Sequence, residues 1–444
     1  MSFGNILTSV GLIFIGILLF EMIILFHEGG HFIAAKLSKV KVNEFSLGMG
    51  PKLFSFKKGE TTYSLRLLPI GGFCAMEGED EDSENPRAFN NAKIFKRMII
   101  IVAGAIMNVV FGLILMMTLL LPSKGFATTT IDQFTPRAFT ANCGLQEGDK
   151  IISIDGYKIN NSLDLSYALA TLKVQTVSGD SLQIYKQDCA NELFLYCAEN
   201  SNNEGFTQDA YDEFLLYIDR INNSASKEEA SSIFADAYKK MSSYFGTENE
   251  VPVIDIRETR QRFRADIVVD RDGERVTLYD VDFFTYLPDA NSQPQLSIDF
   301  YTEGKDKTFF TLMGETGSQT FSVVRMVVDS LGGLIKGEFS FNDVSGPIGA
   351  AKATVDVAQE GLKKSFGDAV LNIVYVMMII SVNLGVVNML PFPALDGGRF
   401  VFLLIEGIFK KPIPRKVESI VNAAGLCLLL VFILLISVKD VFFM

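Results

Sequence analysis

Four long runs of apolar residues alternate with polar segments along the chain. They cover residues 6–26, 98–121, 369–390 and 419–438. Each is close in length to the about 20 predominantly apolar residues that a helix needs to cross a bilayer. The first run has neither a basic start nor a small-residue cleavage site, so it differs from a signal peptide. The pattern therefore predicts four transmembrane helices.

A different pattern fills the long segment between the second and third runs. Apolar and polar residues alternate over 265–283 around an Asp-Gly turn, which predicts two strands of a hairpin. Apolar positions recur at helical spacing over 208–223 and 226–245, and the second stretch opens with a capping-box pattern. Residues 309–340 show amphipathic spacing, which predicts either a helix at the membrane surface or a packing helix of the soluble block.

Charge follows the same division of the chain. Residues 122–366 carry 37 Asp and Glu against 23 Lys and Arg, whereas the short segments after the first and third runs are rich in Lys and Arg. Because basic short loops stay in the cytoplasm, both termini and the acidic block are predicted to lie outside. The formal net charge is −12. A chain without a concentrated basic face is not expected to have a nucleic-acid partner.

The cysteine content excludes a disulfide scaffold, because five cysteines are too few. Cys74 and Cys427 lie in or near membrane segments, where a free thiol behaves as a small hydrophobic group. Cys189 and Cys197 lie close together in the acidic block. Their spacing leaves open whether they form one disulfide outside the cytoplasm.

The first apolar run ends in His27-Glu28-Gly29-Gly30-His31, which matches the H-E-x-x-H pattern. On a helix, positions i and i+4 share a face, so both imidazoles can reach one zinc ion while Glu28 activates a zinc-bound water. The chain's only two histidines lie here, at membrane depth, where ionisable side chains are usually functional. The alternative is a pair of helix-surface histidines at the membrane interface.

A catalytic zinc ion usually takes three protein ligands, and no histidine or suitably spaced cysteine remains to supply the third. The candidate is Asp396, in the segment NMLPFPALDGGRF (388–400). Its prolines and glycines exclude a plain helix, and unwound backbone at membrane depth is tolerated only against protein or a wet cavity. Asp396 is therefore the predicted third ligand, and its alternative role is a helix cap at the cytoplasmic end.

These motifs together resemble the site-2 proteases, which are intramembrane zinc metalloproteases that cut transmembrane helices. The finer resemblance is to the bacterial branch that regulates sigma factors, and it covers most of the chain except about 173–260. The matching segments are FHEGGHFIAAK (26–36), VNEFSLGMGPKLF (42–54), LRLLPIGGFCAMEGE (65–79), AGAIMN (103–108), a PDZ-like stretch, VSGPIGAA (344–351) and SVNLGVVNMLPFPALDGGRFVFLLIE (381–406).

The resemblance implies a catalytic role for each matching residue. His27, His31 and Asp396 resemble the zinc ligands. Glu28 resembles the general base, which takes a proton from zinc-bound water and later donates one to the leaving amine. A first departure from the family pattern is Ala105, where the family usually has proline. The others are Arg399, where it often has histidine, and Gly29, where it usually has a bulky apolar residue.

The resemblance also implies how a substrate is held. A transmembrane helix must unwind before it is cut, and its freed backbone groups need partners that an enzyme strand edge supplies. The candidate edges are FSLGMG and YSLRLLPIGGF, and the alternative is an ordinary cytoplasmic hairpin. The residues implied in substrate binding are Asn388, Pro391 and Pro393 in an extended-substrate loop, and Gly48 and Gly50 in a membrane-re-entrant β-loop.

Glu21 is an acidic residue that the motif does not explain. It lies seven residues before Glu28 and therefore projects on nearly the same helix face. One interpretation is that it lines a water-filled route towards the zinc. The other is that it stays neutral and forms a hydrogen bond with a neighbouring span.

The predicted fold is a polytopic α-helical membrane protein with a membrane-associated β-loop and an extracytoplasmic PDZ-like α+β domain carrying a helical insertion. Two small independent domains are the rival interpretation of the extracytoplasmic block. The predicted boundaries are 1–37 for the first transmembrane helix with H-E-x-x-H, 38–97 for a cytoplasmic or re-entrant β region, 98–121 for the second helix, 122–300 for the PDZ-like domain with an insertion at about 173–260, 301–366 for a juxtamembrane amphipathic region, 367–400 for the third helix with L-D-G, 401–417 for a cytoplasmic loop and 418–444 for the fourth helix.

The predicted function is zinc-dependent intramembrane endopeptidase activity in the bacterial cytoplasmic membrane, with the active site near the cytoplasmic side. Its partners would be the lipid bilayer and single-span membrane proteins already shortened on their outer side, such as anti-sigma factors or remnant signal peptides. The sequence carries no signal for an oligomeric state. The alternative is a membrane-anchored PDZ scaffold with a structural metal site, although structural zinc sites usually have four protein ligands. A metal transporter would need repeated ionisable residues along several spans.

Overall fold

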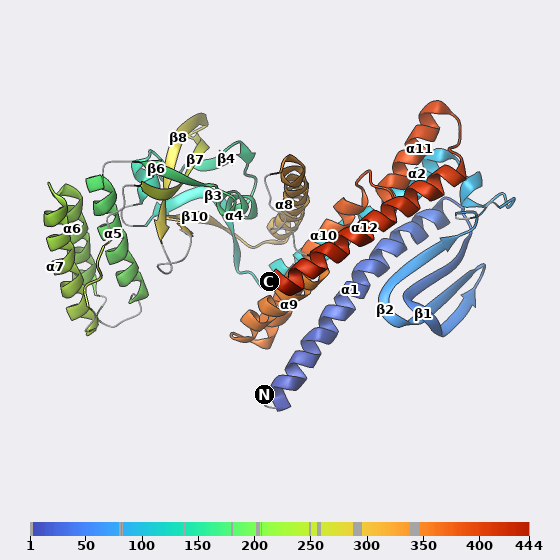
Figure 1. The fold of residues 1–444 in the computed structure, drawn as a ribbon, viewed down its shortest axis with the longest axis horizontal. Coiled ribbons are helices and arrows are strands. Elements are labelled where there is room, and N and C mark those ends of the chain that lie inside the picture. Colours follow the sequence, from blue (N-terminus) through green and yellow to red (C-terminus); the bar gives the residue numbers. More distant parts are fainter. Residues whose placement is uncertain are drawn as a thin grey trace. The chain divides into compact units, whose positions relative to one another are not determined.

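The computed structural model describes residues 3–443 apart from 80, 82, 136–137, 179–180, 201–204, 206, 248–249, 255–258, 287–294 and 338–345. The chain forms two compact units. The membrane unit consists of Met1–Phe126 and Asp306–Met444, and the inserted unit consists of Ala127–Lys305 (Figure 1).

Four helices of the described chain are long and apolar enough to cross a membrane, which confirms the four predicted spans. They are α1 (Phe3–Leu37), α2 (Ile94–Leu120), α10 (Phe366–Asn388) and α12 (Arg415–Phe443). The helices α1, α2 and α10 pack against one another (Figure 1). Most apolar side chains of α12 are exposed. Such apolar exposure suits a helix whose surroundings are lipid.

Helix α2 forms the centre of this packing because small residues let its neighbours approach closely. A Cβ on Gly30 of α1 would lie 2.3 Å from the carbonyl oxygen of Ala103 in α2. A Cβ on Gly385 of α10 would lie 2.9 Å from the carbonyl oxygen of Ala105. Residues that are far apart in the sequence are thereby brought to the same level of the membrane unit.

Three shorter or peripheral helices complete the membrane unit. They are α8 (Phe309–Lys336), α9 (Pro347–Leu362) and α11 (Asp396–Phe409). Helix α8 packs against α2 and α10, so the interpretation of 309–340 as a packing helix of the soluble block is wrong. Its contact face is largely polar and includes Thr316 and Thr320, while Phe310 is 83% exposed.

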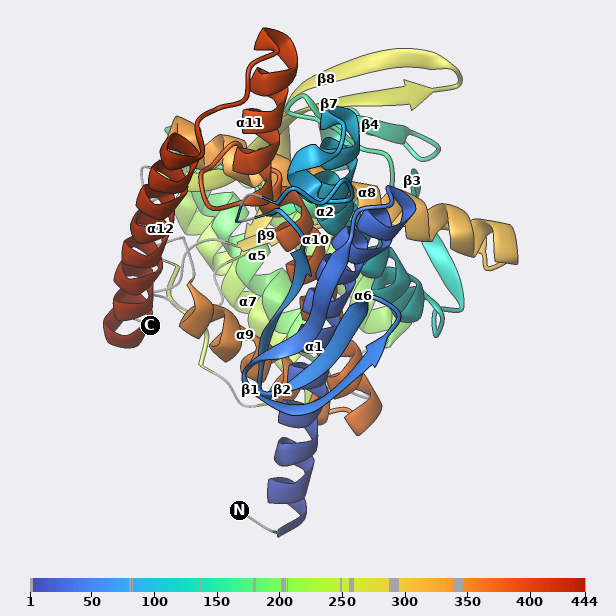
Figure 2. The same ribbon diagram turned by 90° about the vertical axis from the view of Figure 1, so that its right-hand side faces the viewer.

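A curved hairpin of β1 (Val42–Lys58) and β2 (Thr61–Met76) lies alongside α1 (Figure 2). The first half of β1 pairs with residues 72–76 of β2 on one side and with 62–65 on the other. The chain then bends at Gly48, whose φ of +79° and close contact with the carbonyl oxygen of Leu68 both require glycine. Within the described strands, residues 72–76 pair with β1 alone, so they form an edge of the sheet.

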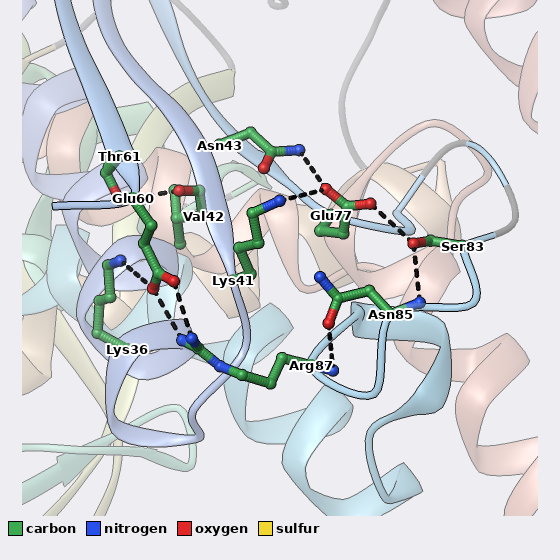
Figure 3. A network of polar contacts seen from close by, with 10 residues as sticks. All are labelled: Lys36, Lys41, Val42, Asn43, Glu60, Thr61, Glu77, Ser83, Asn85 and Arg87. Atoms are coloured by element: carbon green, nitrogen blue, oxygen red, sulfur yellow. Dashed lines mark hydrogen bonds and ion pairs between the residues drawn. The ribbon is translucent and has the colours of Figure 1, made fainter. Parts of the chain in front are cut away.

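Charged groups fasten this hairpin to the C-terminal end of α1 (Figure 3). Glu60, in the turn between the strands, accepts hydrogen bonds from both terminal nitrogens of Arg87 at 2.8 Å and from Lys36 at 3.0 Å. These bonds hold the pKa of the Glu60 carboxyl at about 2. At the far end of β2, Glu77 accepts hydrogen bonds from Lys41, Asn43 and Ser83.

The inserted unit is built on a sheet with strand order β10-β3-β4-β7-β8-β9, with β5 on β4 and β6 on β7. The pairings from β3 to β9 are antiparallel. Its buried core includes Ile131, Ile151, Ile267 and Val281. The strands are β3 (Gly125–Phe134), β4 (Lys150–Ile154), β5 (Tyr157–Lys158), β6 (Val174–Ser178), β7 (Thr259–Arg271), β8 (Glu274–Tyr286), β9 (Gln295–Ser297) and β10 (Phe300–Asp306), with short helices α3 (Phe139–Asn142) and α4 (Ser162–Ala170) beside them.

The strands β7 and β8 confirm the hairpin that alternation over 265–283 predicts. Its turn is Asp272-Gly273, and both residues have positive φ angles, +55° and +88°. Two central residues with positive φ make a type I′ turn, whose twist matches that of the flanking strands.

Three helices follow one another between β6 and β7, namely α5 (Ser181–Glu199), α6 (Gln208–Asn223) and α7 (Lys227–Phe245). They enclose a second core that is separate from that of the sheet and includes Leu193, Ile221 and Met241. The predicted helices α6 and α7 are confirmed. The cap of α7 forms as predicted at Ser226, although the Glu229 carboxylate accepts from the backbone N–H one residue earlier, at Ala225.

The possible disulfide between Cys189 and Cys197 is not formed. Both cysteines lie on α5, eight residues apart, so their α-carbons are about 12 Å apart along the helix axis. A disulfide needs α-carbons within about 7 Å. Both thiols are free and buried, and burial raises the pKa of each to about 12.

Candidate metal centre

Two histidines and one aspartate converge where α1 meets the start of α11. His27 and His31 lie one turn apart on α1, and Asp396 is the first residue of α11. Asp396 Oδ2 lies 3.3 Å from Nε2 of His27 and 3.4 Å from Nε2 of His31. The two Nε2 atoms are 3.4 Å apart. The described part of the chain thus contains a compact triangle of metal-ligating atoms.

The size of this triangle fits zinc. In a tetrahedral site two ligand atoms are separated by about 1.6 times the metal–ligand distance, so the observed separations correspond to bonds of about 2.0–2.1 Å, the range for zinc with nitrogen or oxygen. Asp396 Oδ2 is buried and accepts no hydrogen bond from the described residues, although it faces both imidazoles. Three protein donors with one position left over are typical of a catalytic zinc site.

Helix α2 orients the imidazole rings. Nδ1 of His31 lies 2.8 Å from the carbonyl oxygen of Ile100, so an Nδ1–H donates to it and Nε2 keeps its lone pair for a metal. Nδ1 of His27 lies 3.3 Å from the amide nitrogen of Asn108. Asn108 is fully buried, and its Oδ1 has no partner among the described residues. Turning this amide over would present Oδ1 to the Nδ1–H that ligation through Nε2 requires.

Gly104 of α2 makes room for both rings. A Cβ at this position would lie 2.4 Å from Nε2 of His31 and 3.0 Å from Cε1 of His27. The sequence identifies Gly104 and Asn108 as parts of a family motif but assigns neither a role. A role beside the histidines could have been predicted from the four-residue spacing of Gly104 and Asn108, which places both on the α2 face that meets α1.

Glu28 points towards the edge strand of the β1–β2 hairpin. A Cβ on Gly72 of β2 would lie 3.6 Å from Cγ of Glu28 and 3.2 Å from a methyl group of Ile24. Because residues 72–76 are an edge of the sheet, the Glu28 side chain lies beside an open strand, on the same helix as the two histidines. The absence of a side chain at Gly72 lets the strand backbone pack closely against Ile24 and Glu28.

The chain between α10 and α11 confirms the predicted interruption of the third apolar run. Helix α10 ends at Asn388, whose Nδ2 lies 3.5 Å from Nε2 of His27. The loop 389–395 then folds closely against the first turn of α11. A Cβ on Gly397 would lie 2.1 Å from the carbonyl oxygen of Leu390, and one on Gly398 would lie 2.4 Å from that of Phe392. The two glycines therefore let Asp396 follow the loop directly.

The other substrate-binding candidates belong to the loop before Asp396 and to the bend of β1. Pro391 and Pro393 belong to the loop before Asp396, and Pro393 packs against α12. Gly48 and Gly50 lie at the bend of β1, where Leu68 of β2 fills the space beside both.

The departures from the family pattern have different outcomes. Arg399, one turn into α11, forms an ion pair with Glu79 at 2.5 Å. The Ala105 carbonyl oxygen packs against Gly385 of α10, so this position contributes to the packing of α2. A Cβ on Gly29 would meet no described atom within 4 Å, and nothing in the structure explains why this residue is glycine.

Glu21 is buried without a partner. The residue is only 8% exposed, and neither carboxylate oxygen has a hydrogen-bond partner among the described residues. The predicted hydrogen bond to a neighbouring span is therefore not formed. A buried carboxyl without a partner destabilises a fold, so its retention favours a functional role.

Comparison with known proteins gives a consistent assignment. The profile of Peptidase family M50 matches residues 15–432. The zinc metalloprotease RasP of Bacillus licheniformis is 29% identical over 451 residues, covering 96% of this chain and 97% of the relative. The regulator of sigma-W protease RasP of Bacillus subtilis is 26% identical, covering 96% and 97%. The regulator of sigma E protease of Haemophilus influenzae is 27% identical, covering 91% and 92%.

The matched range contains the H-E-x-x-H motif, the L-D-G motif and the triangle of donor atoms. The predicted family, enzyme class and zinc cofactor are confirmed. The chain belongs to Peptidase family M50, the site-2 proteases, and it is an intramembrane zinc metalloprotease of the bacterial inner membrane.

Proposed function

We propose that the protein cuts single-span membrane proteins within the bilayer, with His27, His31 and Asp396 as zinc ligands and Glu28 as general base. The observation that carries this proposal is the triangle of donor atoms 3.3–3.4 Å apart. When bound there, zinc polarises a peptide carbonyl and lowers the pKa of a water molecule. The remaining chemistry belongs to residues of the chain.

Each of these residues has a separate task. The Ile100 carbonyl and Asn108 hold the imidazoles with Nε2 towards the ion, while Gly104 leaves space for the rings. Glu28 takes a proton from the attacking water and delivers it to the leaving nitrogen of the cut peptide bond. The hydroxyl of the water goes to the carbonyl carbon. One water proton passes through Glu28 to the leaving nitrogen, and the other stays with the new carboxyl group.

The substrate segment is held extended by the edge strand 72–76 of β2. A transmembrane helix that unwinds exposes N–H and C=O groups that lipid cannot satisfy, and pairing with an open strand satisfies them. Gly72 supports this arrangement, because the absence of a side chain lets the edge strand itself lie close to Glu28. Asn388 and the loop with Pro391 and Pro393 would hold the other side of the substrate.

Anti-sigma factors and remnant signal peptides are the proposed substrates, as single-span proteins already trimmed on their outer side. Support comes from the names of two relatives, 'Regulator of sigma-W protease RasP' and 'Regulator of sigma E protease'. Both termini and the inserted unit would lie outside the cytoplasm, because the basic residues gather in 38–97 and 401–417. The metal centre would then lie near the cytoplasmic side.

The inserted unit would be one PDZ-like domain over 122–300 with an insertion at about 173–260. Pairing of β6 with β7 supports one domain, because the chain leaves and re-enters the sheet at neighbouring strands. PDZ folds take a peptide as an added strand, so this unit would dock or filter substrates by size. The following region, 301–366, would contact the membrane surface through exposed aromatic residues such as Phe309 and Phe310.

The test uses the purified full chain with a single-span transmembrane reporter. The wild type is expected to cut the reporter within its apolar segment, and zinc chelation or the Glu28→Gln substitution is expected to abolish cleavage. Zinc content and thermal unfolding of Glu28→Gln show whether the variant is folded and loaded. Equal cleavage by Glu28→Gln would overturn the mechanism. Reporter binding without cleavage by loaded wild type would instead favour a scaffold.

A further inference from the structure

The loop that leads into Asp396 is held by α12, a helix with no residue in the catalytic assignments above. Oδ1 of Asn422 in α12 accepts a hydrogen bond from the backbone N–H of Ala394 at 3.3 Å. Ala394 has a φ of +76°, which non-glycine residues rarely adopt and which persists only where surroundings enforce it. Asn422 is one of the groups that enforce it.

A second contact one turn along α12 acts on the neighbouring residue of the loop. A Cβ on Gly425 would lie 2.5 Å from Cβ of Pro393 and 2.7 Å from its carbonyl oxygen. The helix backbone therefore rests directly on Pro393. Gly425 is buried, whereas Leu426 and Leu428 beside it are 48% and 60% exposed, so α12 meets the loop at the glycine.

The position of the loop closely determines the position of Asp396. Asp396 follows Ala394 by two residues, and the close contacts of Gly397 and Gly398 with the carbonyl oxygens of the same loop make the loop and the first turn of α11 one compact piece. A shift of this piece would move Asp396 Oδ2 relative to the two imidazoles. Ligand atoms need to be held within about 0.5 Å of their working geometry.

We propose that Asn422 and Gly425 are positioning residues that fix the aspartate of the metal centre from α12. This inference rests on the proposed assignment of Asp396 as a zinc ligand. Neither residue touches the metal-ligating atoms. Their effect is on how tightly zinc is held and how fast the bound substrate is cut, and not on how tightly substrate binds.

The experiment measures zinc affinity of the full chain by competition with a chelator, together with kcat and KM on the reporter. Asn422→Ala removes the acceptor and Gly425→Ala forces a methyl group against Pro393. Each is expected to weaken zinc binding at least about tenfold, as loss of outer-shell partners does. Each should lower kcat more than it changes KM. Asn422→Asp keeps an acceptor oxygen and should restore most of the zinc affinity.

Two controls make the outcome decisive. Leu428→Ala alters α12 at an exposed position and should leave zinc affinity unchanged. Asp396→Asn should lose zinc, and full zinc occupancy in that variant would contradict the ligand assignment itself. If Asp396→Asn loses zinc but folded Asn422→Ala and Gly425→Ala both bind it as tightly as wild type, the positioning role is wrong. Should Gly425→Ala fail to fold, Asn422→Ala alone decides.

Discussion

Gly104 and Gly29 lie near the same two histidines but differ in the space around them. A Cβ on Gly104 would collide with His31, whereas a Cβ on Gly29 would meet no described atom within 4 Å. One glycine is therefore required by the close packing of α2 against the two imidazoles, and the other carries only the lower helix propensity of its type. The two positions form a matched pair for substitution by alanine.

Gly104→Ala is expected to lower zinc affinity about 10-fold to 100-fold, because the added methyl displaces the His31 ring. Gly29→Ala is expected to keep zinc and to stabilise the chain by about 0.5–1 kcal/mol. Chelator competition and thermal unfolding measure the two effects. Full zinc affinity in Gly104→Ala would show that the ring is not confined by α2.

At the scale of elements, α9 depends on a cap from outside its own segment. Its N-cap residue, Gly346, has no side chain to offer. The carboxylate of Asp440, in the last turns of α12, instead accepts hydrogen bonds from the backbone N–H groups of Gly346 and Gly349, both at 2.9 Å. Both donors belong to the segment VSGPIGAA, of which Val344 and Ser345 lie outside the described residues.

Asp440→Ala should therefore loosen the start of α9. Loss of a helix cap destabilises by about 0.5–2 kcal/mol. Hydrogen exchange at residues 346–350 is expected to accelerate, while exchange in the middle of α10 stays as in wild type. Asp440→Asn retains an acceptor oxygen and should show a smaller change. Unchanged exchange in Asp440→Ala would mean that α9 is held by its other contacts.

The β1–β2 hairpin should loosen in acid. The pKa of Glu60 is about 2, well below the 4.5 of an unperturbed glutamate, chiefly because Arg87 and then Lys36 donate to it. A lowered folded-state pKa means that this group stabilises the hairpin above about pH 4.5 and loses that contribution as the pH falls towards 2. Hydrogen exchange in residues 58–63 across this window measures it.

Glu60→Gln should show fast exchange in that segment already at neutral pH, with a weaker dependence on pH below 4.5. Glu81→Gln, which alters an exposed glutamate of the same region, provides the matched control. If wild type and Glu60→Gln respond to acid alike, another carboxylate carries the effect. Glu77 would be the next candidate, because its pKa is also about 2.

Local patterns in the sequence predict the elements well and their long-range contacts poorly. Apolar runs and helical spacing suffice for the four spans and for α6 and α7, because those elements satisfy their own backbone groups. The proximity of Asp396 to His27 could be predicted because a catalytic zinc site usually has three protein ligands and the sequence offers only two histidines. No sequence pattern predicts that the Ile100 carbonyl accepts from His31 or that Asn422 accepts from Ala394, because a backbone acceptor or a single amide side chain has no sequence signature.

At the scale of the whole molecule, the helices α5 to α7 form a module with its own core. Ser178 at the end of β6 pairs with Thr259 at the start of β7. Two strands whose ends already face each other can be joined by a two-residue turn such as Asn-Gly. The insertion is therefore expected to be removable, together with its own core, without disturbing the core of the sheet.

Replacement of residues 179–258 by Asn-Gly tests this expectation. The shortened chain should fold, bind zinc as tightly as the full chain and cut the transmembrane reporter, because the metal centre lies wholly in the membrane unit. Zinc titration, circular dichroism and the cleavage assay measure these properties. Loss of the sheet of the inserted unit in the shortened chain would indicate that α5 to α7 contribute to its folding.

The donors of the metal centre come from opposite ends of the chain: two from α1 and one from the first residue of α11. Synthesis proceeds from the amino terminus, so a growing chain holds both histidines in the membrane long before the aspartate exists. Two imidazoles alone bind zinc weakly and leave it open to competing ligands. On the proposed ligand assignment, the ability to hydrolyse peptides in the bilayer would therefore begin only after residue 396 has been made and inserted.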